Sequence, residues 1–140
     1  WCPEMVNIAD HNNTKVFRYA DAILMMAECY LELDDTDNAM RYLNMVKDRA
    51  QIARYETFKN YDHLHEEIER ERARELFGEF QRKYDLVRWG SWYRQTFDYT
   101  DYKSLQDNIL PCHEYYPIPD KEVTYSGNAL DNDAYAEWGL

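Results

Sequence analysis

Apolar residues recur at every third or fourth position between residues 15 and 53, which predicts two amphipathic helices. The stripe of the first helix comprises Phe17, Ala20, Leu24, Ala27 and Leu31, widened by Ile23 and Tyr30. The stripe of the second comprises Ala39, Tyr42, Leu43, Val46 and Ala50. Polar residues 12–14 offer N-caps for the first helix, and residues 34–36 offer one for the second. Because so few residues connect the helices, we expect an antiparallel hairpin.

A third helix is predicted from residue 60, where Asn60 or Asp62 provides the N-cap. Its inner face comprises Leu64, Ile68, Leu76, Phe77, Phe80 and Tyr84. The charged stretch 71–90 is expected to continue as a helix that stops at Gly90, with Gly78 marking a kink or a close helix contact. Residues 60–93 therefore form the second predicted group of helices.

Acidic and basic residues of this stretch stand three or four positions apart, a spacing that favours ion pairs along a helix. The candidate pairs are Glu71 with Arg74 or Glu75 with Arg72, and Glu79 with Arg82 or Lys83. Each exposed pair contributes only a few tenths of a kcal/mol, so the simplest interpretation is a solvated helix face.

Residues 94–140 have a different character, because Pro111, Pro117, Pro119 and Gly127 exclude a long helix. We expect ordered coil that wraps over the helices and is held down by its aromatic side chains. The predicted fold class is all-α: one helical hairpin plus further helices, wrapped by an irregular, aromatic-rich C-terminal segment. A length of 140 residues suits a single domain over 1–140.

The net charge of −11 argues against nucleic acid and against anionic lipid surfaces, which both require basic patches. It is compatible with a neutral ligand or a protein partner. Cys29 lies in the apolar pattern and is expected to be a buried thiol, whereas Cys2 and Cys112 are left open as a possible pair. The chain begins with Trp1, which indicates a piece of a larger or processed protein.

No residue pattern indicates catalysis, a metal or a cofactor. His63 and His65 are two positions apart and point to different sides of a helix, so surface histidines are expected. His113 beside Cys112 has no sequence neighbour that completes a nucleophilic site, and no glycine-rich phosphate loop is present. We therefore expect a protein that is not an enzyme.

Aromatic and acidic residues alternate after Gly90 and form the candidate binding surface. Its members are Trp92, Tyr93, Tyr99 and Tyr102, with Asp98 and Asp101 between them. Aromatic rings can stack on the apolar faces of sugars while carboxylates accept hydrogen bonds from sugar hydroxyls. The alternative is that the rings hold the segment against the helices, and this is the favoured interpretation.

Three stretches in order resemble the SusD/RagB family of nutrient-binding lipoproteins. The first is Arg18-Tyr19-Ala20-Asp21 at the start of an alanine-rich helix; the second is the stretch 71–90. The third is Pro117-Ile118-Pro119 with Glu122, followed by Asn128, Leu130, Asn132 and Tyr135. The sequence departs from the family pattern at Phe80, where a glycine is usual, and at Ala129, Asp133 and Ala134.

The resemblance implies tetratricopeptide-like hairpins in the C-terminal portion of a longer, surface-exposed outer-membrane lipoprotein, anchored by lipid on its absent N-terminal part. It also implies capture of glycans or peptides, and delivery to a SusC-like TonB-dependent transporter, without catalysis. Glu75, Arg82, Asp85, Arg88 and Trp89 of the family motif are assigned to structure. The alternative function is a helical interaction scaffold of an outer-membrane complex that binds no nutrient.

Overall fold

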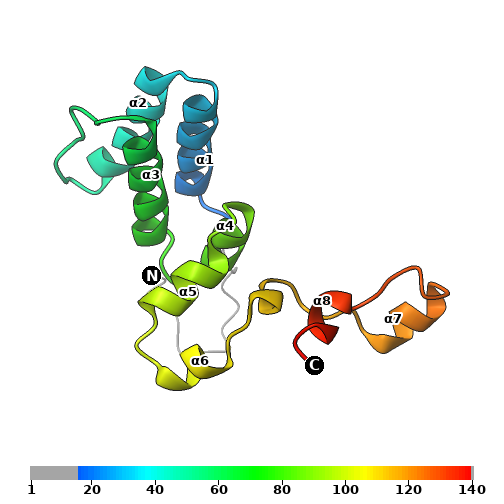
Figure 1. Cartoon of the computed structure of the whole chain (residues 1–140). Helices are drawn as coiled ribbons and strands as arrows, with labels where there is room; N and C mark the ends of the chain where they lie inside the picture. The colour runs from blue at the N-terminus through cyan, green and yellow to red at the C-terminus, as the bar shows by residue number, and fades with distance from the viewer. Residues whose placement is uncertain (1–15, 140) are drawn as a thin grey trace, which may run out of the picture. The chain divides into compact units, whose positions relative to one another are not determined.

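The computed structural model describes residues 16–139, which form helices, turns and loops and contain no strand. The all-α fold class predicted from the sequence is therefore confirmed. The helices are α1 (Tyr19–Glu32), α2 (Thr36–Arg49), α3 (Tyr61–Glu75), α4 (Arg82–Arg88), α5 (Trp92–Tyr99), α6 (Lys103–Asn108), the 3₁₀ helix η1 (Pro111–Glu114), α7 (Asp120–Tyr125) and α8 (Asp133–Ala136) (Figure 1). Contacts divide the chain into unit 1, up to Arg82, and unit 2, from Lys83. The single domain over 1–140, with parts 15–53, 60–93 and 94–140, stays a prediction.

Helices α1 and α2 form the predicted hairpin of unit 1 and lie side by side (Figure 1). The turn between them contains Asp34 at φ +60°, and the Asp35 side chain caps α2 by accepting a hydrogen bond from the Asn38 N–H at 3.1 Å. The predicted cap within residues 34–36 is thus confirmed. Most of the predicted stripes are buried, namely Ala20, Ile23, Leu24, Ala27 and Leu31 on α1 and Ala39, Leu43 and Val46 on α2.

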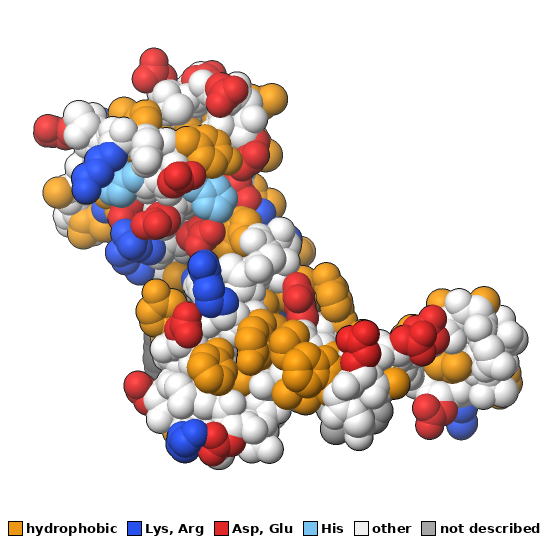
Figure 2. Space-filling model, in the orientation of Figure 1, with side chains coloured by type: hydrophobic (Ala, Val, Ile, Leu, Met, Phe, Trp, Pro, Cys, Tyr) orange, Lys and Arg blue, Asp and Glu red, His pale blue; other side chains and the backbone are white. Residues whose placement is uncertain are grey.

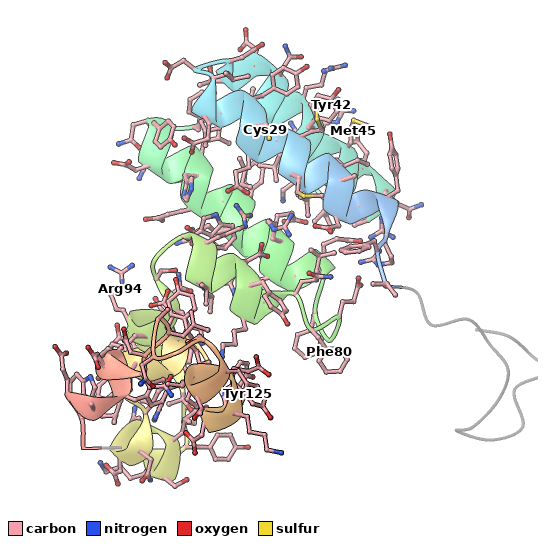
Figure 3. The ribbon with its side chains drawn as sticks, turned by 90° about the vertical axis from the view of Figure 1, so that its right-hand side faces the viewer. Cys29, Tyr42, Met45, Phe80, Arg94 and Tyr125 are labelled. Atoms are coloured by element: carbon pink, nitrogen blue, oxygen red, sulfur yellow. The ribbon has the colours of Figure 1, made fainter. Side chains whose placement is uncertain are left out.

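The ends of the hairpin differ from the prediction. Helix α1 begins at Tyr19 with Arg18 as its N-cap residue, so Phe17 precedes the helix and is exposed. The caps predicted at 12–14 lie outside the described residues. Ala50 is exposed because it is the C-cap residue of α2. Cys29 is exposed rather than buried (Figure 3), because it lies two residues after Ala27 and hence ~200° around the helix from the buried stripe.

Helix α3 completes unit 1 by packing Leu64 and Ile68 into the cluster formed by α1 and α2. Of the two cap residues that the sequence offered, Asn60 caps α3, and its side chain accepts a hydrogen bond from the His63 N–H at 3.0 Å. The loop before α3 is fixed by Asn44, whose amide bonds to both the N–H and the carbonyl of Tyr55, at 2.8 and 2.9 Å. Three helices therefore share one hydrophobic core.

The stretch 71–90 is not one helix, contrary to the prediction. Helix α3 ends at Glu75, and the turn that follows contains Gly78 at φ +77° and Phe80 at φ +61°, conformations that no right-handed helix can continue through. Three members of the predicted inner face are buried, namely Leu64, Ile68 and Leu76. The exposed members are Phe77, Phe80 and Tyr84, and Phe80 projects away from the ribbon (Figure 3).

Unit 2 has its own hydrophobic cluster, which comprises Leu86 of α4, Trp92 of α5 and Ile109. Gly90 lies between the two helices at φ +64°, and its N–H donates to the carbonyl of Val87 at 2.9 Å, so the predicted stop is confirmed. After α5, the helices of unit 2 have six residues or fewer. The aromatic side chains of residues 94–140 are not all packed against helices, because Tyr99, Tyr102, Tyr115, Tyr116 and Tyr125 are exposed.

Among residues 16–139, no helix is long and apolar enough to cross a membrane. Cys112 is buried in unit 2. Cys2 lies outside the described residues, so its pairing with Cys112 stays a prediction.

Candidate functional site

Arg18 links the start of α1 to the end of α3 in unit 1. Its guanidinium donates to the Glu75 carboxylate at 2.8 Å, to the Glu75 carbonyl at 2.6 Å and to the Glu79 carboxylate at 2.7 Å. Hydrogen bonds to Glu79 and then Glu75 raise the pKa of Arg18 above its ordinary value. Arg49 of α2 also pairs with Glu75, at 2.5 Å. One glutamate of the family motif thus joins α1, α2 and α3.

A buried ion pair adds a second link between α1 and α3. Arg72 donates to Asp21 at 2.8 Å, and the two side chains are only 4% and 7% exposed. Of the two alternatives predicted from the spacing, the pair of Glu71 and Arg74 is confirmed, at 3.1 Å. Glu75 and Arg72 instead pair with residues at the start of α1, and Glu75 also pairs with α2.

The other residues assigned to structure make local contacts. Arg82 donates to the carbonyl of Glu69 at 3.3 Å. In unit 2, the buried Asp85 accepts a hydrogen bond from Arg88 at 3.1 Å, and the Arg88 guanidinium lies 4.6 Å from the centre of the Trp89 ring. These contacts agree with a structural role, and the assignment of Glu75, Arg82, Asp85, Arg88 and Trp89 stays a prediction.

The predicted binding residues fall into two groups. Trp92 is 9% exposed in the core of unit 2, and Tyr93 packs against that core with its ring 5.9 Å from the ring of Phe97. Tyr99 and Tyr102 are 82% and 74% exposed, and Asp98 and Asp101 are also exposed. Of the predicted binding residues, these four therefore present rings and carboxylates to solvent. Other hydrophobic side chains gather on the visible surface around α4 and α5 (Figure 2).

The histidines of α3 have neighbours within their own segment. The Nδ1 atom of His63 accepts a hydrogen bond from the Lys59 N–H at 3.2 Å, and His65 lies 3.2 Å from Glu69. Over the described part of the chain, no three His, Cys, Asp or Glu side chains gather in a group suited to a metal ion. Figure 2 shows histidine, acidic and basic side chains side by side on the surface of unit 1.

The sequence did not indicate an open groove in unit 2, with a volume of about 500 Å³. It lies between the segment from Pro111 to Ile118 and the segment from Asp131 to Trp138. Tyr115, Tyr116, Tyr135 and Trp138 supply rings, and Glu114, Asp131 and Glu137 supply carboxylates. The aromatic content of the C-terminal segment indicated a possible binding surface, but the sequence did not show which rings would line the same groove.

Two residues of the third family-like stretch hold the walls of this groove together. Asn132 accepts a hydrogen bond from the Ile118 N–H at 2.8 Å and donates to the Ile118 carbonyl at 2.9 Å. The Tyr135 hydroxyl donates to the carbonyl of Tyr115, and desolvation raises the pKa of Tyr135 above its ordinary value. The motif residues thus position the backbone of the segment around Pro117 and Pro119.

Known proteins resemble this chain along most of its length. The family model described as the SusD family matches residues 5–135. A SusD-like protein of Formosa agariphila is 40% identical over 128 residues, which is 88% of this chain and 24% of that protein. The crystal structure of a SusD superfamily protein from Bacteroides vulgatus matches with a TM-score of 0.68 and 33% identity, covering 78% of this chain and 25% of that one. The chain spans about a quarter of the length of these relatives.

The matched range includes all three stretches that carry the resemblance, and the solved structure shares the helical fold. The structure also gives these stretches physical roles, since Arg18 and Asp21 of the first bind the end of α3 in the second. The chain belongs to the SusD/RagB family.

Proposed function

We propose that the full-length protein is a non-catalytic binding protein of the cell surface, held at the outer membrane by a lipid anchor. It captures glycans or peptides and delivers them to a partner SusC-like TonB-dependent transporter. The observation that carries this proposal is the family match over residues 5–135. The 140 residues form the C-terminal portion of this protein.

The surface of unit 2 supports capture of a neutral or weakly polar ligand. Tyr99 and Tyr102 expose their rings, and Asp98 and Asp101 lie beside them in the sequence with exposed side chains. Rings that are already exposed and polar groups that accept hydrogen bonds are the elements from which sugar and peptide sites are built. These four residues are the proposed contacts, and Trp92 and Tyr93 are proposed to support them from the core.

The proposed partner is tested by using the full-length protein as bait in an outer-membrane extract and identifying bound proteins by mass spectrometry. We expect a TonB-dependent barrel as the main partner. Beads that carry an unrelated lipoprotein serve as the control for non-specific capture. Recovery of other envelope proteins without such a barrel contradicts delivery to a transporter and favours the helical scaffold.

Capture is tested separately by titrating glycans and peptides into the full-length protein in a calorimeter. A Tyr99→Ala, Tyr102→Ala double variant is expected to bind roughly tenfold more weakly, which corresponds to a loss of about 1.4 kcal/mol for the two rings together. The matched control is Tyr125→Ala, which removes an equally exposed ring from α7. Equal losses in both variants would show that the effect is not specific to the proposed contacts.

A further inference from the structure

The groove of unit 2 has the dimensions and the lining of a small-molecule site. Its volume of about 500 Å³ lies within the range of roughly 300–1,000 Å³ that is usual for ligand pockets. Tyr115, Tyr116 and Trp138 line it and keep substantial exposed area, so their rings are available for contact. A ligand can therefore reach aromatic surface here without displacing a core side chain.

The polar groups of the lining fit a ligand that both donates and accepts hydrogen bonds. Glu114, Asp131 and Glu137 supply acceptor oxygens, and the indole of Trp138 and the tyrosine hydroxyls supply donors. Sugar hydroxyls need both kinds of partner, and the C–H groups on a pyranose face carry the partial positive charge that an aromatic face attracts. No lysine or arginine appears among the described residues that line the groove, which disfavours an anionic ligand.

A cationic ligand would have to compete with a cation that the protein already provides. The ammonium group of Lys83 lies 4.2 Å from the centre of the Tyr116 ring and 5.2 Å from that of Trp92, and it donates to the His113 carbonyl at 3.4 Å. This fixed charge occupies the site at Tyr116 where a cation–π contact with a ligand would form. The remaining chemistry favours a neutral, hydroxyl-rich ring.

The groove is pre-organised, which lowers the entropic cost of binding. Both walls are joined by the paired hydrogen bonds between Asn132 and the backbone of Ile118. The Tyr135 hydroxyl bonds to the Tyr115 carbonyl, and the Tyr135 ring lies 6.0 Å from the ring of His113. Ordering of these walls has therefore already occurred before a ligand arrives.

We propose that this groove is a saccharide subsite, in which a neutral sugar ring stacks on Trp138 and its hydroxyls bond to Glu114 and Asp131. The site is distinct from the residues Tyr99 and Tyr102 proposed above, and the inference rests on the proposed function of nutrient capture.

The test uses the full-length protein and isothermal titration calorimetry with maltohexaose, laminarihexaose and xylohexaose as neutral probes. Trigalacturonate and trilysine serve as the anionic and cationic probes. The variants are Trp138→Ala, which removes the ring, and Glu114→Gln, which keeps the shape and removes the charge. The matched controls are Tyr125→Ala and Glu122→Gln on α7, whose side chains are exposed and do not line the groove. Circular dichroism checks that each variant is folded.

We expect at least one neutral probe to bind, with roughly tenfold weaker binding in Trp138→Ala and a smaller loss in Glu114→Gln. The controls should bind as the unchanged protein does. Affinity for the neutral probe should hardly change between 50 and 500 mM salt, because no charge is neutralised on binding.

Neutral-probe binding that survives both groove variants overturns the subsite and leaves nutrient capture in place elsewhere on the protein. Binding of trilysine alone, weakened by salt and by Glu114→Gln, overturns the saccharide assignment in favour of a cationic peptide. If no saccharide and no peptide binds the full-length protein, the proposed function fails together with this inference.

Discussion

Phe80 combines two unfavourable features in one residue. It adopts a left-handed backbone conformation at φ +61°, and its large apolar side chain is 90% exposed. For a residue with a Cβ atom this conformation costs about 1 kcal/mol or more. The rest of the turn holds it in place, because Glu79 is bound by Arg18 and the Glu79 N–H donates to the Leu76 carbonyl at 3.1 Å.

Replacing Phe80 by glycine should therefore increase the free energy of unfolding by up to about 1 kcal/mol, as measured by urea denaturation of the full-length protein. The matched control is Phe77→Gly, since Phe77 is 87% exposed in the same turn but has no positive φ. The free energy of unfolding of that variant should not increase. A gain in Phe77→Gly as large as in Phe80→Gly would show that loss of exposed apolar surface, not backbone strain, is responsible.

Asp21 and Arg72 illustrate the opposite case, in which burial makes a polar contact important. Asp21→Ala removes the carboxylate that binds the buried guanidinium of Arg72, and we expect a loss of ~3–5 kcal/mol in the free energy of unfolding. The control is Asp107→Ala, which breaks the exposed pair with Lys103 and should cost less than ~1 kcal/mol.

A second comparison separates the ion pair from simple packing. The conservative variant Asp21→Asn keeps the size of the side chain and an acceptor oxygen for Arg72 but removes the charge, so it should lose less stability than Asp21→Ala. Equal losses in Asp21→Asn and Asp21→Ala would show that the charge of Asp21, and not the space that its side chain fills, stabilises the fold.

At the level of the helices, the sequence predicts the N-terminal ends of α2 and α3 better than the C-terminal end of α3. The caps at Asp35 and Asn60 were predictable because a side-chain oxygen must satisfy free N–H groups at a helix start. The break after Glu75 was not, because Gly78 alone is compatible with a kinked helix and nothing in the identity of Phe80 favours positive φ. Cys29 was misplaced because its apolar character suggested burial, whereas its position on α1 faces outward.

The cap of α2 gives this helix an acid-sensitive start. The Asn38 side chain and then the Asn38 N–H donate to Asp35 and hold the pKa of its carboxyl below the ordinary value. Asp35 thus binds a proton less readily in the folded protein than in the unfolded one. The ionised carboxylate stabilises the fold fully at pH values above the pKa of Asp in the unfolded chain, which is about 4. This stabilisation is lost as the pH falls through the lower pKa of Asp35 in the folded protein.

Asp35→Asn keeps an acceptor for the Asn38 N–H but cannot titrate, so it is the variant that isolates this effect. We expect the melting temperature of the unchanged protein to fall faster than that of Asp35→Asn as the pH decreases from 5 to 2. Parallel curves for the two proteins would contradict a titrating cap.

The two segments that form the groove walls, 111–118 and 131–138, are held together by the side chain of Asn132. Asn132→Ala removes both hydrogen bonds to Ile118, each worth about 1 kcal/mol, so amide exchange at Ile118 should accelerate roughly ten- to thirtyfold. The control is Asn108→Ala, whose side chain bonds to the Ser104 carbonyl on α6. Unchanged exchange at Ile118 would show that other contacts hold the walls.

For the molecule as a whole, the separate hydrophobic clusters of the two units define where stability resides. Periodicity predicted much of the first cluster, because its members repeat along regular helices. The second cluster and the groove were not predictable in this way. Leu86, Trp92 and Ile109 come from short helices and loops, and the groove depends on the bonds between Asn132 and Ile118, which no sequence period encodes.

Leu43 is fully buried among α1, α2 and α3, so Leu43→Ala should leave a cavity that costs ~2–5 kcal/mol. By hydrogen exchange of the full-length protein, we expect protection to fall most within residues 19–75 and less around Leu86 and Ile109. Leu105→Ala, at a half-exposed position of α6, is the control. Equal losses in both clusters would show that the two units share one cooperative core.

The long-range ion pairs of unit 1 also bear on the order of events during synthesis. Arg72 follows Asp21 by 51 residues, and Glu75 follows Arg18 by 57. At ~5–20 residues per second, the ribosome adds these partners ~3–11 seconds after Asp21 and Arg18. During this interval the hairpin of α1 and α2 has Asp21 and Arg18 without their partners from α3. A chaperone that shields the inner face of the hairpin would have to bind before α3 leaves the ribosome.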